Sequence, residues 1–372
     1  MTTTSYWLAE PFELKTKRTS SPVDVTIVGA GVTGCSCALA LAERGLRVRV
    51  HEARRVAAGA SGRNGGFALR GAAMPYDRAQ AQFGPERARL LWQLTESALV
   101  RLRSLAGDAF RLVGSLRLAA DEAEREQLAR ELAALREDGF AAEWLEELPP
   151  PLCASYRGAI LHPGDGALDP ARWVRRLAER ACRAGAEIVE ESSVAPADLE
   201  PPVVLAADGL LAAGVRELEP HVWPERGQML ATEPLPERLY GRPHYARNGF
   251  DYWQQLPDGT LIVGGKRDAD FESERTAEEA TTPVIQGRLD ELVTQLVGRL
   301  PRVTHRWAGI WGQTPDRLPL VGRVGEREGL WVAGGYSGHG NVLGLACGEL
   351  VARAIVGERP RELALFEPGR FA

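Results

Sequence analysis

The sequence lacks any long hydrophobic run. Among its 372 residues no apolar stretch approaches ~18, the length that a membrane-spanning helix needs, so we expect no transmembrane segment. The N-terminal stretch MTTTSYWLAEPFELKTKR also lacks the apolar core of a secretory signal peptide. A net charge of −5 gives little reason to expect nucleic acid or an anionic membrane as a partner. We therefore expect a cytoplasmic protein.

Cysteine is scarce, with five residues and no spacing typical of a zinc site. Cys35 and Cys37 lie in a predicted apolar helix, where a small buried hydrophobic residue is a simpler interpretation than a metal ligand. We therefore expect no metal. An odd number of thiols also fits a reducing compartment better than secretion.

Repeats and low-complexity segments are absent as well, and the composition is that of a soluble globular enzyme. Hydrophobic residues make up 44% of the chain and charged residues 26%. The length exceeds that of one typical domain, which favours two domains.

The order of predicted elements indicates how these domains are assembled. Residues 23–52 alternate strand, glycine turn, helix and strand, which is typical of a parallel βαβ unit. Residues 222–271 look antiparallel and contain a hairpin around Pro257-Asp258-Gly259. The remaining predicted helices cover residues 86–105, 121–137, 169–183, 285–300 and 341–355, and the remaining strands cover 110–120, 186–190, 202–206 and 330–333. The sequence thus predicts an α/β domain with an α+β domain inserted into it.

A glycine turn lies directly after the first strand and before the first helix. Gly29, Gly31 and Gly34 match G-x-G-x-x-G, which allows a tight turn, backbone approach to a pyrophosphate and close helix packing. The helix N-terminus then offers free N–H groups to the anion. Glu52, 18 residues after Gly34, ends the second strand, where a carboxylate can accept both ribose hydroxyls. The pattern favours FAD or NAD over NADP.

Residues 58–66, Ala-Gly-Ala-Ser-Gly-Arg-Asn-Gly-Gly, decide between these two dinucleotides. So many small residues would not build a core, but they let the backbone run beside a flat, bulky ligand. Ser61, Arg63 and Asn64 would present polar groups to it. A flexible surface loop is the alternative, yet an arginine and an asparagine between glycines, shortly after the ribose acid, favour a ligand clamp and FAD.

With these motifs, the chain resembles the D-amino acid oxidase superfamily of FAD-dependent oxidoreductases. The likeness extends to glycine and sarcosine oxidases and to the branch that includes gamma-glutamylputrescine oxidoreductase. The motifs that carry it span almost the whole chain: Ser5-Tyr6-Trp7, the glycine turn, residues 59–66, Arg226-Gly227-Gln228-Met229 and residues 334–340 (Gly-Gly-Tyr-Ser-Gly-His-Gly).

The resemblance implies a Rossmann-like FAD-binding domain with an inserted antiparallel-sheet substrate domain, the glutathione-reductase-2 type of fold. The FAD-binding domain would comprise residues 1–75, 150–215 and 305–372, and the substrate domain residues 76–149 and 216–304. The implied cofactor-binding residues are Gly29, Gly31, Val32, Thr33, Gly34, Glu52, Ala53, Arg54, Ala60, Ser61, Arg63, Asn64, Gly65, Val194, Gly312, Gly338, His339, Gly340 and Asn341.

Two parts of the expected FAD site bear on how the cofactor is held. The segment between Ser192 and Pro202 is too short for the small antiparallel meander of the family, although Val194 is still expected to contact adenine through its backbone. Covalent attachment needs a cysteine or histidine beside the flavin ring. Only His305 is available near the expected ring position, and it should precede the pocket, so we expect non-covalent FAD.

The catalytic residues expected from the resemblance are Trp311, Tyr252, His339 and Tyr336. Residues 338–341 open the last helix, whose N-terminus would stabilise negative charge at the pyrimidine edge of the reduced flavin. His339 would either add a hydrogen-bond donor there or fix the glycine loop. Tyr252, Trp253 and Tyr336 would form an aromatic cage over the ring, unless the tryptophans belong to the core.

Trp311 occupies the position at which amino-acid-oxidising relatives have an arginine for the substrate carboxylate. An indole cannot grip a carboxylate, but it can hold a cation or an apolar chain, which favours an amine over an amino acid. Arg317 is expected outside the pocket. Ile262 aligns with the lysine that speeds the reaction of sarcosine oxidases with oxygen, and Lys266 lies a few residues later. Oxidase and dehydrogenase therefore both remain open.

Three functions follow. The first is oxidation of a C–N bond of a small amine to an imine by hydride transfer to flavin N5, with oxygen (giving hydrogen peroxide) or another acceptor reoxidising the flavin. The second is an amino acid oxidase or dehydrogenase of the D-amino acid, glycine or sarcosine type, using Arg70, Arg247 or another arginine. The third is a catalytically silent flavin protein that acts through partners. A nicotinamide dehydrogenase would not need Arg63 and Asn64.

Overall fold

The computed structural model describes residues 4–16, 22–324 and 328–371, so the outer parts of the N-terminal stretch considered above lie outside the described residues. A six-stranded sheet has the order β16-β17-β10-β1-β2-β9. Its strands are β1 (Val25–Val28), β2 (Val48–His51), β9 (Glu187–Val189), β10 (Val203–Leu205), β16 (Leu320–Arg323) and β17 (Leu330–Gly334).

A larger, eight-stranded sheet has the order β15-β11-β14-β13-β12-β5-β7-β6, and a small one has the order β3-β8-β4. The strands of the larger sheet are β5 (Ser115–Leu118), β6 (Glu143–Leu145), β7 (Ala159–His162), β11 (Trp223–Pro234), β12 (His244–Ala246), β13 (Asp251–Gln255), β14 (Thr260–Gly265) and β15 (Val303–Gln313). Those of the small sheet are β3 (Phe67–Ala68), β4 (Phe110–Arg111) and β8 (Gly166–Leu168).

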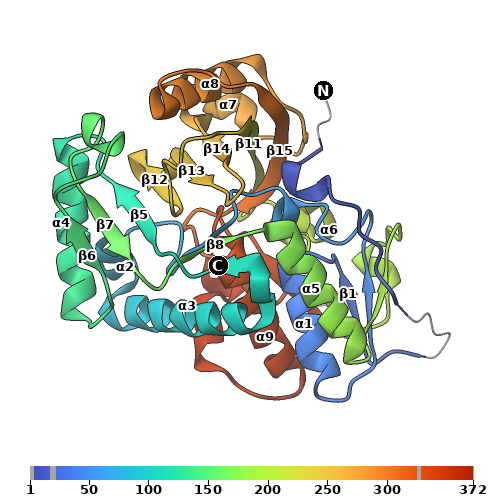
Figure 1. The fold of residues 1–372 in the computed structure, drawn as a ribbon. Coiled ribbons are helices and arrows are strands. Elements are labelled where there is room, and N and C mark those ends of the chain that lie inside the picture. Colours follow the sequence, from blue (N-terminus) through green and yellow to red (C-terminus); the bar gives the residue numbers. More distant parts are fainter. Residues whose placement is uncertain (1–3, 17–21, 325–327, 372) are drawn as a thin grey trace.

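Helices cover both large sheets (Figure 1). They are α1 (Val32–Ala42), α2 (Tyr76–Phe83), α3 (Pro85–Ala106), α4 (Glu122–Glu137), α5 (Pro170–Arg183), α6 (Leu211–Gly214), α7 (Phe271–Glu274), α8 (Pro283–Val297) and α9 (Gly340–Ile355). Asp121 and Asp169 cap α4 and α5 by accepting the Glu124 and Arg172 backbone N–H groups, as the N-cap residue types predict. No helix of the described residues is both long and apolar enough to cross a membrane.

The six-stranded sheet confirms the predicted βαβ unit. β1 pairs in parallel with β2 on one side and with β10 on the other, while β16 is an antiparallel edge strand. Helix α1 connects β1 to β2, and every one of its side chains is buried because it packs between the sheet, α5 and α9. Valine-rich strands covered on both faces are typical of such parallel sheets.

The eight-stranded sheet has two faces with different neighbours. Helices α7 and α8 lie over the far face, at the top of Figure 1. On the near face, Glu225, Gly227 and Met229 of β11 lie opposite Trp311, Gly309 and Trp307 of β15. Arg63 of the glycine-rich segment contacts Gly309 there, which means that this face is turned towards the predicted clamp loop.

Strand alternation corrects one expectation. Trp253 was predicted to join the aromatic cage, but neighbouring side chains of a strand point to opposite faces, and Trp253 points away from its neighbour Tyr252. Its side chain is fully buried in the core beneath α8, stacked on His244 with ring centroids 5.3 Å apart. Trp253 therefore belongs to the core.

Sheet membership bears on the proposed domain boundaries at residues 150 and 305. β7 and most of β15 fall on the FAD-binding side of those boundaries, yet both pair within the eight-stranded sheet. Between β9 and β10 the only regular element is a 3-10 turn, Pro196–Asp198, which leaves no meander in this described segment.

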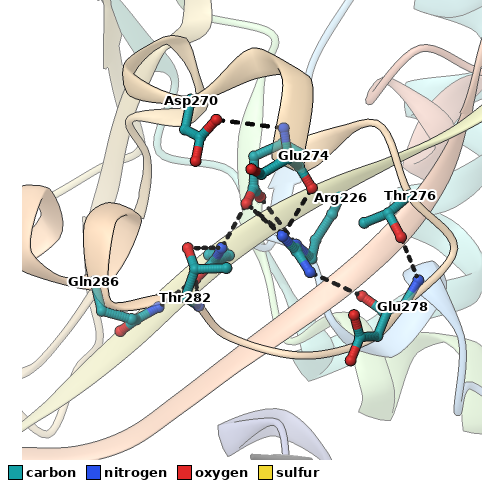
Figure 2. A network of polar contacts seen from close by, with 9 residues as sticks. Arg226, Asp270, Glu274, Thr276, Glu278, Thr282 and Gln286 are labelled. Carbon is teal, nitrogen blue, oxygen red and sulfur yellow. Dashed lines mark hydrogen bonds and ion pairs between the residues drawn. The ribbon is translucent and has the colours of Figure 1, made fainter.

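A buried polar network joins β11 to the α7–α8 connection on the far face (Figure 2). Arg226 and Glu274 are 3% and 1% exposed, and Arg226 Nη2 lies 2.8 Å from Glu274 Oε1. Gln228 donates to the same carboxylate oxygen and to Thr282 Oγ1. A buried ion pair whose donors and acceptors are satisfied in this way fixes the position of both segments.

Replacing Glu274 with alanine should lower the free energy of unfolding by ~3–5 kcal/mol, because it leaves the Arg226 charge buried without its carboxylate. Urea unfolding measures this loss. Glu272 lies two residues earlier in α7 and is exposed. Glu272→Ala is therefore the matched control, with an expected change in the free energy of unfolding within ~0.5 kcal/mol. Equal losses in the two variants would contradict the structural importance of the pair.

Candidate functional site

The glycine turn has the geometry that a bound pyrophosphate requires. Gly29 has a positive φ of 105°, and a Cβ on it would lie 2.5 Å from the Ala206 carbonyl oxygen. A Cβ on Gly34 would collide with the Gly29 carbonyl, so only glycine lets α1 start this close to β1. Gly31, the N-cap residue of α1, has no side chain that could cap the helix. The Val32 N–H donates to Ser61 Oγ of the clamp loop, 3.1 Å away.

The predicted ribose acid lies against this turn. Glu52 Oε2 accepts the Ala30 N–H at 2.8 Å, and Oε1 accepts the Arg54 N–H at 2.9 Å. The shortened segment runs beside it, since the Ser192 N–H donates to the Glu52 carbonyl oxygen at 2.8 Å. Val194 follows two residues later and is half-buried, and its contact with adenine stays a prediction.

The clamp loop is held through its backbone carbonyls. Trp7 Nε1 donates to the Asn64 oxygen and Trp307 Nε1 to the Arg63 oxygen, both at 2.8 Å. Gln254 Nε2 donates to the Gly65 oxygen at 2.6 Å. Sequence reasoning missed Trp307 and Gln254, whose only signal is that strand alternation turns both towards the near face of the eight-stranded sheet.

Asn64 and Asn341 join the clamp loop to the start of α9. Asn341 Nδ2 donates to Asn64 Oδ1 at 3.1 Å and to the Phe67 carbonyl oxygen at 2.8 Å. Asn64 Nδ2 donates to the Ala60 carbonyl oxygen at 3.0 Å. Two predicted cofactor-binding segments that lie far apart in the sequence are thus brought into one site.

The start of α9 presents backbone N–H groups rather than a charged side chain. His339 is the N-cap residue and makes no side-chain cap to this described helix, and the space above Gly338 is open. Burial, with smaller effects from the Arg117 and Arg317 charges, lowers the pKa of His339 to about 4. The imidazole is therefore neutral at neutral pH, and positive potential comes from the helix end.

Trp311 and Tyr252 both lie on the near face of the sheet, and their role towards a substrate stays a prediction. The Trp311 indole lies over Gly227, where a Cβ would be 2.5 Å from the ring. The Tyr252 ring packs on Gly264 and also contacts Gly65 of the clamp loop. Burial raises the pKa of Tyr252 to about 12, so its phenol keeps its proton at neutral pH.

An arginine missed by sequence reasoning lies beside Trp311. The Arg267 guanidinium carbon is 5.4 Å from the centroid of the Trp311 ring and also lies over Phe250 and Phe271. Its Nη1 is 2.5 Å from Oε2 of Glu225, the residue directly opposite Trp311 in the sheet. Only the pairing of β14 with β11 and of β11 with β15 brings Arg267 here, so no local pattern could have found it.

The arginines considered for the substrate carboxylate are engaged elsewhere. Arg70 Nη1 lies 2.6 Å from Glu96 Oε1, with the arginine side chain almost fully buried. Arg247 pairs with Asp251 at 3.1 Å and with Asp268. Neither charge is directed at Trp311.

Two further predicted positions have structural surroundings. Ile262 is fully buried against Met229 and Trp307, and Lys266 Nζ lies 2.8 Å from Asp251 Oδ2. The lysine is therefore on the side of the molecule that carries Arg247, not beside Ile262.

Tyr336 is 3% exposed, and its hydroxyl lies 2.8 Å from Thr33 Oγ1, a contact that ties the β17–α9 loop to α1. This placement supports a structural part for Tyr336 rather than a place beside Trp311. His305 packs edge-on against Tyr6, and Arg317 is exposed, as expected for a residue outside the pocket.

Comparison with known proteins identifies the family to which the chain belongs. Residues 24–354 match the DAO family, described as FAD dependent oxidoreductase. The chain belongs to the DAO family of FAD-dependent oxidoreductases. The expected family, the fold class and the cofactor FAD are thereby confirmed.

Individual relatives cover nearly the whole of this DAO-family chain. Probable oxidoreductase OrdL of Rhizobium meliloti (strain 1021) is 30% identical over 91% of this chain and 84% of its own length. Gamma-glutamylputrescine oxidoreductase of Escherichia coli (strain K12) is 28% identical over 96% of this chain and 90% of its own. The crystal structure of glycine oxidase from Geobacillus kaustophilus has a TM-score of 0.77 and 26% identity, covering 94% and 98% of the two chains.

The residues of this DAO-family site fit FAD. The start of α1, to which Gly31 gives no side-chain cap of its own, and the glycine turn suit a pyrophosphate, and Glu52 offers carboxylate oxygens to a ribose. The open space above Gly338 lies where the α9 N-terminus is free to face an anionic ring edge. The individual assignments of Ala53, Ala60, Ser61 and the other predicted contacts to FAD stay predictions.

Asp208 is a further member of the site that sequence reasoning missed. It follows β10, and its Oδ1 accepts the Gly335 N–H at 2.8 Å and the Tyr336 N–H at 3.3 Å. Gly312 packs against both Asp208 and Gly335, since a Cβ on it would lie 2.8 Å from each. Burial raises the pKa of Asp208 from 3.8 to about 6, although the backbone donors act in the opposite direction.

This pKa predicts a pH dependence of stability. Between 3.8 and about 6 the folded protein keeps a proton that the unfolded chain releases, so stability falls as pH rises through this window. Asp208→Asn keeps the acceptor but does not titrate. Its free energy of unfolding relative to the wild type should rise by about 1–3 kcal/mol across the window, the lower figure applying if solvent screens the carboxylate. Parallel urea titrations over this pH range measure it, and a constant difference would contradict the raised pKa.

Proposed function

We propose that the protein oxidises the C–N bond of a small amine to an imine, with bound FAD taking the hydride at N5. The observation that carries this proposal is the position of Trp311 and Tyr252, two aromatic side chains on the sheet face turned towards the clamp loop. An indole and a phenol suit an amine with an apolar chain. The name of the Escherichia coli relative, gamma-glutamylputrescine oxidoreductase, points to the same chemistry.

The side chains around this face have limited roles in proton transfer. Because the pKa of Tyr252 is about 12, its phenol can donate a hydrogen bond but cannot accept a proton from an ammonium group at neutral pH. The amine must therefore reach the site in its neutral form or lose its proton to water. The N-terminus of α9 supplies positive potential for the charge that arrives with the hydride.

A second candidate, oxidation of an amino acid, is favoured by Arg267. Its guanidinium lies against the ring of Trp311, the position at which an arginine was expected for this function. A carboxylate would have to replace Glu225 as the partner of Arg267. The name glycine oxidase, carried by another relative, agrees with this alternative.

A substrate panel tests the proposal. Under anaerobic conditions, polyamines, N-methyl amines and D-amino acids are added to the yellow holoenzyme, and bleaching of the flavin absorbance reports oxidation. We expect bleaching by one of the amines, followed in air by a peroxide assay to identify oxygen or another acceptor. Bleaching by none would favour the catalytically silent protein. Acid precipitation of the same sample should release the yellow colour into the supernatant, as non-covalent FAD requires.

Arg267→Met separates the two candidates. An amine substrate should keep kcat/KM within a few-fold of the wild-type value, because no carboxylate depends on the guanidinium. An amino acid should lose ~10²-fold or more, since a bidentate charge-assisted contact would be removed. Steady-state kinetics on the best substrate of the panel measures the change, and Arg275→Met, which removes the neighbouring cation over Trp223, is the control.

A further inference from the structure

The connection between α7 and α8, residues 275–282, runs from the far face of the eight-stranded sheet to residues 52–66. We call these residues the FAD-binding segment, because they carry many of the predicted FAD contacts. Glu279 lies in the middle of this connection. Its Oε2 is 2.7 Å from Arg54 Nη1 and its Oε1 is 3.0 Å from Arg54 Nη2, which is a bidentate pair. Oε2 also lies 3.5 Å from Nη2 of Arg63. The Glu279 carboxylate thus contacts two predicted cofactor-binding residues, Arg54 and Arg63.

Both arginines lie along the segment that carries the predicted FAD contacts. Arg54 follows two residues after Glu52, whose carboxylate accepts the Arg54 backbone N–H. The Arg63 guanidinium already donates to the Ala58 and Ala308 carbonyl oxygens at 2.8 and 3.1 Å. Both arginines therefore direct side-chain donors at Glu279, which is an acid that they share.

The connection that carries Glu279 is anchored on both sides. Arg226 of the buried network donates to the Glu278 carbonyl oxygen at 3.4 Å, immediately before Glu279. Three residues after it, the Thr282 N–H donates to Gln228 Oε1 at 2.9 Å. Figure 2 shows these anchors around the Arg226–Glu274 pair. A carboxylate held between two fixed points loses little further entropy when it pairs with Arg54.

We propose that Glu279 is a positioning residue for cofactor retention. It fastens the α7–α8 connection onto the FAD-binding segment, so that FAD leaves only after the Glu279–Arg54–Arg63 contact has opened. Simple electrostatics predicts the opposite sign, because removing a carboxylate beside two arginines would strengthen their attraction for the anionic pyrophosphate. The direction of the change in FAD release therefore decides between fastening and repulsion.

The test dilutes the purified holoenzyme and measures the rate at which FAD leaves it. The readout is the increase in fluorescence as FAD is released. Glu279→Gln should release FAD ~10-fold faster than the wild type. Glu237→Gln is the matched control, since Glu237, in the loop after β11, forms an exposed bidentate pair with Arg299 at 2.8 and 3.1 Å. Its release rate should equal that of the wild type.

Release from Glu279→Gln that is unchanged or slower would overturn the proposal, and so would equal acceleration in both variants. Glu279→Asp keeps the charge but shortens its reach, and we expect a rate between those of the wild type and Glu279→Gln. Equal urea midpoints for the apo forms show that a faster release does not reflect general unfolding. The proposal depends on FAD binding alone, so a failure to oxidise amines leaves this measurement unaffected.

Discussion

The site depends on hydrogen bonds from side chains to the carbonyl groups of the clamp loop. Residues 58–66 contain too little side chain to fix their own conformation, and their carbonyl groups lie against the eight-stranded sheet, where unpaired polar groups are costly. Trp7, Trp307 and Gln254 provide the donors from the N-terminal segment, β15 and β13. The same three contacts set the position of the near face of the sheet relative to the clamp loop, and therefore the position of Trp311 and Tyr252.

Features with a local cause could be read from the sequence. The glycine turn, the βαβ unit and helices α4 and α5 depend on residues close together in the chain, and the structure has them where they were predicted. The prediction that Trp253 joins the aromatic cage was wrong, because neighbouring residues of a strand point to opposite faces of the sheet. Arg267, Asp208 and Glu279 could not be found, because their partners are set by strand pairing and by the path of the α7–α8 connection.

The surroundings of Trp311 show how little the identity of one aligned residue says about the charge of a pocket. The missing arginine was a reason to expect an amine, yet Arg267 brings a guanidinium to the same indole from the end of another strand. Its pairing with Glu225 leaves the local charge balanced. The charge around Trp311 is therefore set by residues of several strands of the sheet together.

The packing of α1 against α9 has a consequence for biosynthesis. Ser36 Oγ donates to the Leu345 carbonyl oxygen, 309 positions further along the chain, and Thr33 meets Tyr336 in the same interface. While a ribosome is still making the middle of the protein, α1 has no α9 to pack against. Contacts of such sequence separation form slowly. The α1–α9 interface therefore forms only after the C-terminal part of the chain has been made, and an N-terminal half released early would carry the glycine turn with this side of α1 uncovered.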